Sequence, residues 1–111
     1  MRITIELMRV FVGYGYNDRD DWIERDVFPI LEALNLEIVS GKDIHGQVLH
    51  ETVEERIELS DGLIGFSTLR TGQNNADFGS HIWVRDEMRH ALTLKKPVVE
   101  VREKGVKIDN A

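Results

Sequence analysis

Residues 83–92 read WVRDEMRHAL, and this stretch predicts the helix around which the rest of the chain is arranged. At about 100° per residue, Trp83, Glu87 and His90 share one stripe of that helix, beside a second stripe that is mostly apolar. The helix is therefore expected to pack through the apolar stripe and to hold an indole and a carboxylate side by side at its margin. Two interpretations stay open: a catalytic Glu beside a Trp, or a solvated Glu beside a core-edge Trp. The apolar stripe comprises Val84, Met88, Ala91, Leu92 and Lys95.

The composition is that of an ordinary globular domain, and 111 residues suffice for one compact core but not for two. The chain has no cysteine, which excludes disulfides, thiolate metal sites and cysteine nucleophiles. The net charge is −6 and no basic face is evident, so we expect no nucleic-acid partner. No apolar run approaches the roughly 20 residues of a membrane span, and no signal-peptide pattern is present. We therefore expect a cytoplasmic protein without a membrane partner.

Four short apolar runs predict strands, and three amphipathic stretches between them predict helices. The alternation of strand and helix predicts one α/β domain over residues 1–111, with a parallel sheet in the strand order 2-1-3-4 and helices on both faces. Inside the first helix, Pro29 is expected to kink the chain or to begin a second segment. The strands are expected at 10–12, 36–39, 63–66 and 97–101, and the helices at 23–34, 47–59 and 83–95. A further edge strand at 2–7 is suggested by alternating polarity.

Three loops follow predicted strands, at 13–20, 40–46 and 67–80. Ligands of parallel sheets bind outside the carboxyl ends of the strands, where these loops gather. The loop at 67–80 has no periodicity, and loops of that length in small domains are usually functional or mobile. The sequence thus predicts one cleft, lined by Tyr14, Tyr16, Asp18, Ser67, Trp83 and Glu87.

Several common sites are excluded by single residues. Gly13 and Gly15 begin a dinucleotide-binding fingerprint, but Asp18 occupies the place of its third glycine and would repel a pyrophosphate. Phe66 and Ser67 stand where a phosphoacceptor Asp would follow the third strand. Neither a P-loop nor a Gly-x-Ser-x-Gly nucleophile turn occurs. The four histidines have no helical metal-ligand spacing, so no metal site is expected.

The segment VFVGYGYND at 10–18 resembles the opening strand and loop of a TIR (Toll/interleukin-1 receptor) domain. The likeness extends over residues 9–102, through Trp22 and the segment 27–32 of the first helix, the second strand and BB loop at 36–46, the approach to the third strand at 57–64, and a W-x-x-x-E motif at Trp83 and Glu87. Two features depart from that family. Gly13 and Gly15 replace its commoner serines, and the chain ends before a fifth strand and a last helix. It is thus expected to be either a fragment or a trimmed variant in which residues 2–7 substitute for a strand.

In the enzymatic branch of that family, the W-x-x-x-E glutamate cleaves the nicotinamide–ribose bond of NAD⁺. The resemblance therefore implies an NAD⁺ nucleosidase with Glu87 as the catalytic residue and NAD⁺ as a substrate, with no cofactor. Trp83 would supply a stacking face, Tyr14 or Tyr16 would cover nicotinamide and ribose, and Asp18 and Ser67 would line the cleft. The product would be ADP-ribose or a cyclic ADP-ribose.

The resemblance further implies self-association with other TIR domains, a fused or separate nucleotide-sensing domain, and a role in antiviral or cell-death signalling. Two alternatives remain open. One is a non-catalytic TIR adaptor that acts only through assembly. The other is an enzyme like the nucleoside deoxyribosyltransferases, which also use a Glu in an α/β sheet.

Overall fold

The computed structural model describes residues 2, 8–44, 50–69 and 82–106. The described strands are β1 (Met8–Gly13), β2 (Leu36–Val39), β3 (Gly62–Ser67) and β4 (Val98–Arg102). The described helices are α1 (Phe28–Ala33), α2 (Glu51–Glu58) and α3 (Ile82–Thr93), with shorter turns η1 (Asp18–Asp20), η2 (Ile23–Val27) and η3 (Lys42–Ile44). The strand suggested at 2–7 and most of the loop at 67–80 lie outside the described residues.

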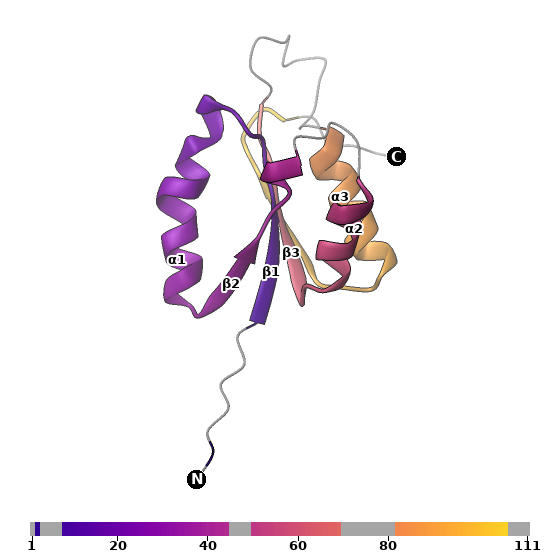
Figure 1. Cartoon of the computed structure of the whole chain (residues 1–111). Coiled ribbons are helices and arrows are strands. Elements are labelled where there is room, and N and C mark those ends of the chain that lie inside the picture. Colours follow the sequence, from indigo (N-terminus) through magenta and orange to yellow (C-terminus); the bar gives the residue numbers. More distant parts are fainter. Residues whose placement is uncertain (1, 3–7, 45–49, 70–81, 107–111) are drawn as a thin grey trace.

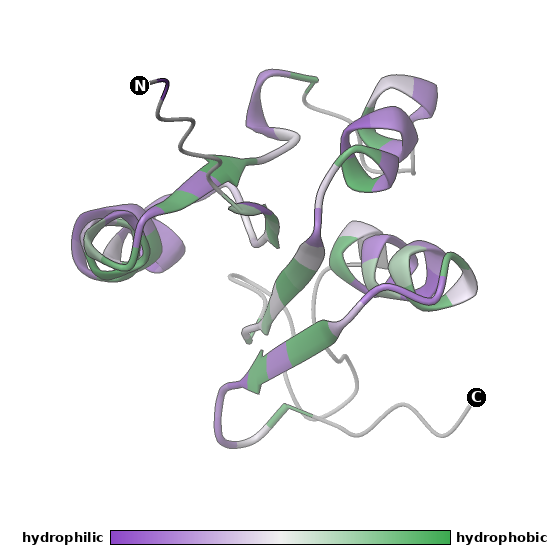
Figure 2. Cartoon of the chain, turned by 90° about the horizontal axis from the view of Figure 1, so that it is seen from below, coloured by the Kyte–Doolittle hydropathy of each residue, from purple (hydrophilic) through white to green (hydrophobic). Residues whose placement is uncertain are grey.

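The described strands form one all-parallel sheet in the order β2-β1-β3-β4, which confirms the predicted fold class and strand order. Helix α1 covers one face of the sheet, and α2 and α3 cover the other, so the domain has three layers (Figure 1). A view from below shows the same arrangement, with helices on both sides of the strands (Figure 2). None of the helices in the described ranges has both the length and the apolar character that crossing a membrane requires.

Strand β1 lies between β2 and β3 and contributes to the core on both faces. Val10 and Val12 belong to the apolar cluster under α1, whereas Phe11, between them, belongs to the cluster under α2 and α3. Both faces are covered because a parallel sheet needs helical crossovers, which explains why this strand reads as a continuous apolar run.

The apolar stripe of α3 is only partly where the sequence places it. Val84 and Ala91 are fully buried, and Met88 packs so closely on Gly65 of β3 that a Cβ there would lie 2.6 Å from the Met88 sulfur. Leu92, by contrast, is 59 % exposed, which corrects its assignment to the core. Measured around the axis from Val84, the buried arc extends about 60° to Glu87 on one side, whereas Leu92 falls about 80° away on the other. The helix thus turns Glu87 inward.

The first helix is divided near Pro29, as predicted. A π-helical turn, η2, precedes α1, and Pro29 falls in the first turn of α1, where its missing N–H costs nothing. The π turn adds a residue to the helix and rotates the residues after it by about 100°. Ile30 and Leu34 are consequently exposed, while Ile23 and Leu31 are buried.

Candidate active site

Glu87 lies on α3 beside the carboxyl ends of β1 and β2, and only 3 % of its surface is exposed. A Cβ on Gly13, the last residue of β1, would lie 2.6 Å from Glu87 Oε1. A Cβ on Gly41, which follows β2, would lie 3.7 Å from Glu87 Oε2. The carboxyl group therefore sits between two glycines, in space that any larger residue at position 13 would fill.

Few described groups offset the energetic cost of burying the Glu87 carboxyl. Among the described residues, no donor lies within hydrogen-bond distance of its Oε1 atom. Burial raises the pKa of Glu87 from its ordinary value of 4.5 to about 8, and the neighbouring charge of Asp86 adds to the increase. Such a group can accept hydrogen bonds from a ligand or stabilise its positive charge, since its Oε1 atom has no donor among the described residues.

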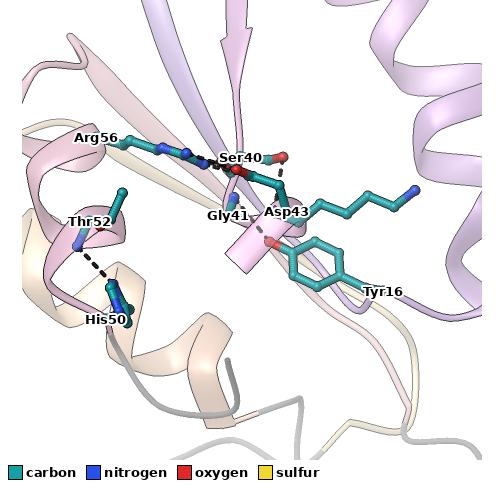
Figure 3. Close-up of polar contacts among 8 residues, drawn as sticks. Tyr16, Ser40, Gly41, Asp43, His50, Thr52 and Arg56 are labelled. Carbon is teal, nitrogen blue, oxygen red and sulfur yellow. Dashed lines mark hydrogen bonds and ion pairs between the residues drawn. The ribbon is translucent and has the colours of Figure 1, made fainter. Parts of the chain in front are cut away.

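Tyr16 covers this carboxyl from the loop after β1. Its ring stacks on Trp83, with centroids 6.1 Å apart and planes 22° from parallel. Its hydroxyl accepts a 3.2 Å hydrogen bond from the backbone N–H of Gly41 (Figure 3). Burial and then the nearby charge of Glu87 raise the pKa of Tyr16, so this hydroxyl stays protonated. In this structure Tyr16 occupies the face of Trp83 that the sequence assigned to substrate stacking.

The loop after β2 is held by Arg56 of α2. Its guanidinium donates to the backbone oxygen of Ser40 at 2.8 Å and to both carboxylate oxygens of Asp43, at 2.6 and 3.0 Å (Figure 3). A bidentate pair of this kind defines the orientation of both side chains. The result is a fixed position for Gly41, and hence for the hydrogen bond that anchors Tyr16.

Tyr14 belongs to the other side of the site. Its ring is 2 % exposed and lies in the apolar cluster under α1, with its hydroxyl donating to Glu24 at 2.7 Å. Lys42 donates to the same carboxylate at 2.8 and 3.0 Å. The backbone oxygen of Tyr14 accepts a 3.1 Å hydrogen bond from Trp83 Nε1 of α3. That bond ties the start of α3 to the loop after β1.

Asp18 lines a pocket of about 240 Å³ whose lining includes Tyr16 but not Glu87. It is exposed at the start of η1, whose N-cap is Asn17. Four of the pocket's side chains are acidic and one is basic, so the pocket favours polar or cationic groups. Its lining comprises Tyr14, Gly15, Tyr16, Asn17, Asp18, Asp20, Asp21, Glu24 and Lys42.

Ser67 is buried at the end of β3, where its hydroxyl donates to Glu100 of β4 at 2.6 Å. The Ser67 hydroxyl therefore links β3 to β4. Of the six predicted site residues, Glu87, Tyr16 and Trp83 form one cluster, Tyr14 and Asp18 lie around the neighbouring pocket, and Ser67 contacts β4. Within the described ranges, no three His, Asp or Glu side chains are grouped as a metal site would require.

Gly41 and Arg56 have a part in this site that the sequence did not suggest. Gly41 leaves room for the Glu87 carboxyl and donates to Tyr16, and Arg56 secures its loop. The only available signal was a glycine just beyond a strand end, after Ser40, which is common in turns and carries no indication of which distant side chain approaches it.

Comparison with known proteins gives a structural likeness without a sequence match. No family model matches the chain, and no curated protein matches its sequence. A solved structure, a 2-desoxiribosyltransferase from Leishmania mexicana, superposes with a TM-score of 0.64 at 9 % identity, covering 93 % of this chain and 79 % of that one. At this identity the likeness shows a shared α/β fold.

Proposed function

We propose that this domain cleaves the N-glycosidic bond between nicotinamide and ribose in NAD⁺, with Glu87 as the catalytic carboxylate. The observation that carries the proposal is the place of Glu87: a buried carboxyl at the carboxyl end of a parallel sheet, between two glycines, with no described donor to its Oε1 atom. The structural likeness to an enzyme named for transferring a deoxyribosyl group supports the same bond type.

The reaction needs one carboxylate and no general acid. As the C–N bond breaks, its electron pair goes to the nicotinamide nitrogen, which leaves neutral, and positive charge develops on the ribose. Ionised Glu87 would accept hydrogen bonds from the ribose hydroxyls and stabilise that charge. Water then adds to the ribosyl carbon and loses a proton, so that NAD⁺ and water give ADP-ribose, nicotinamide and one proton.

The resting site must open before this can occur, because Glu87 is almost completely buried. Tyr16 is the side chain best placed to move, since it belongs to a loop and its recorded contacts are one backbone hydrogen bond, stacking on Trp83 and an edge contact with Tyr14. Displacing its ring would free the indole face for the nicotinamide, as the sequence resemblance implies for Trp83. The adjoining pocket, which Tyr16 also lines, would then join the space beside Glu87.

The test is nicotinamide release from NAD⁺ by the purified chain, followed by chromatography, for the wild type, Glu87→Gln and Glu32→Gln. Glu32 is the matched control because it is exposed on α1, on the opposite face of the sheet. We expect at least a hundredfold loss in Glu87→Gln and none in Glu32→Gln. Equal release by all three proteins, at a rate above that of buffer, would assign the cleavage to another group.

A second function, 2-deoxyribosyl transfer between bases, is favoured by the structural neighbour alone. It uses the same carboxylate on a different sugar, so base exchange on 2′-deoxynucleosides separates the two. Exchange without nicotinamide release would select the transferase. If neither reaction occurs although the chain is folded, the non-catalytic adaptor implied by the resemblance becomes the better proposal.

A further inference from the structure

Strand β4 ends the sheet with an apolar surface. Val99 and Val101 are 56 % and 40 % exposed, on the face of the sheet that α1 covers at its other end. That helix packs against β2, at the opposite edge from β4. Among the described residues, β3 is the only strand that pairs with β4, and no described strand pairs with the outer edge of β4. Edges of this kind pair readily with another strand.

The hydrogen bonds to β3 show which residues of β4 face outward. Pro97 O accepts from Leu63 N, and Glu103 N donates to Ser67 O. Because the backbone groups of a strand alternate between its two sides, the odd-numbered residues bond toward β3. The backbone groups of Val98, Glu100 and Arg102 therefore point away from the sheet.

The side chains at this edge are complementary to themselves in one antiparallel register. A two-fold axis at Val101 would place Glu100 opposite Arg102 of the second copy, and Arg102 opposite its Glu100. These are outward-facing residues, so each pair can exchange two backbone hydrogen bonds, and their charges are opposite. An axis at Glu100 or at Arg102 would instead place like charges together. The alternation of backbone hydrogen-bonding groups and the side-chain charges thus both favour a two-fold axis at Val101.

We propose that β4 pairs antiparallel with β4 of a second copy of this chain about Val101, which joins the described four-stranded sheets of the two copies into one continuous sheet. The two Val101 side chains meet in a non-hydrogen-bonded pair, where side chains approach most closely. Glu100 and Arg102 already form an ion pair within the strand at 2.5 Å, and pairing would extend it into a four-membered charge cluster across the axis. This inference does not depend on the proposed function.

Disulfide trapping tests the register, because the natural chain has no cysteine. A non-hydrogen-bonded antiparallel pair has Cα atoms about 4.5 Å apart, within the range a disulfide spans, so V101C should cross-link under mild oxidation. V99C is the matched control: in this register its two thiols are about 13 Å apart along the strands and should not cross-link. Cross-linking of V99C but not V101C, or of both equally, would overturn the register.

Charge exchange supplies an independent test by light scattering during size-exclusion chromatography. The wild type at high concentration should show twice the 12.8 kDa mass of one chain. E100R and R102E each place like charges opposite one another and should weaken the dimer by tenfold or more. An equimolar mixture of the two variants pairs opposite charges and should restore it, as should the double variant E100R/R102E. A monomeric wild type, or a mixture that stays monomeric while circular dichroism shows both variants folded, would overturn the proposal.

Discussion

Glu87 Oε1 lies only 2.6 Å from the position that a Cβ atom would take on Gly13, so the two atoms could not both be there. Residue 13 ends the first described strand and residue 87 belongs to the last described helix, so this contact joins segments that are far apart in the sequence. The carboxyl can therefore be buried in this position only if residue 13 is glycine. TIR domains, which the sequence resembles, commonly have serine in this loop. Four predictions follow from the environment of this carboxyl.

Replacing Gly13 by Ala should force the Glu87 carboxyl to move. The backbone of Gly13 has no left-handed φ, so the strain comes from the contact and not from the main chain. We expect a loss of about 1–3 kcal/mol in the free energy of unfolding, measured in urea. In a Glu87→Ala background the added methyl group meets empty space, and the loss should nearly vanish. An undiminished loss in that background would show that the cost arises elsewhere.

The pKa of Glu87 predicts a pH-dependent stability. Between its ordinary value of 4.5 and about 8, the folded chain holds a proton that the unfolded chain has lost. The free energy of unfolding should therefore be highest below pH 4.5 with respect to this group, and fall by about 1 kcal/mol per pH unit up to pH 8. Glu87→Gln, which cannot ionise, should lack this part of the slope. Parallel pH profiles of the two proteins would contradict the assignment.

The same ionisation predicts the pH dependence of NAD⁺ cleavage. Because the carboxylate form stabilises the ribosyl charge, kcat/KM should rise about tenfold per pH unit and level off above pH 8. Asp86→Asn removes the second cause of the raised pKa and should move this rise to lower pH without abolishing activity. A profile that is flat between pH 5 and pH 9 would exclude Glu87 as the titrating catalytic group.

Removing the Tyr16 hydroxyl should leave the backbone N–H of buried Gly41 without its partner. Tyr16→Phe keeps the stacking on Trp83, so we expect a loss of about 1 kcal/mol in the free energy of unfolding. Tyr14→Phe is the comparison: Glu24, the acceptor of the Tyr14 hydroxyl, is partly exposed and retains Lys42, so the loss should be smaller. Chemical denaturation of both variants would distinguish them, and an equal loss would remove the special role of the Gly41 contact.

The sequence by itself determined the layers of this domain. The run at 10–12 is apolar throughout because both faces of a central parallel strand are buried, and the helices between the strands leave one topology class. It also placed Trp83 and Glu87 on the last described helix. These are local patterns, repeated every two or about 3.6 residues, and no knowledge of distant contacts is needed to recognise them.

The tertiary structure alone decided which side of each helix faces the core and which distant residues it contacts. The π turn before Pro29 rotated Ile30 and Leu34 into solvent, and the packing of Met88 on Gly65 rolled α3 so that Glu87 faces inward and Leu92 outward. The surroundings of Glu87 come from residues 13, 16 and 41, which are far from it in the chain. Burial, and with it the pKa of a carboxyl, depends on the sum of such approaches, and a periodic pattern carries no information about them.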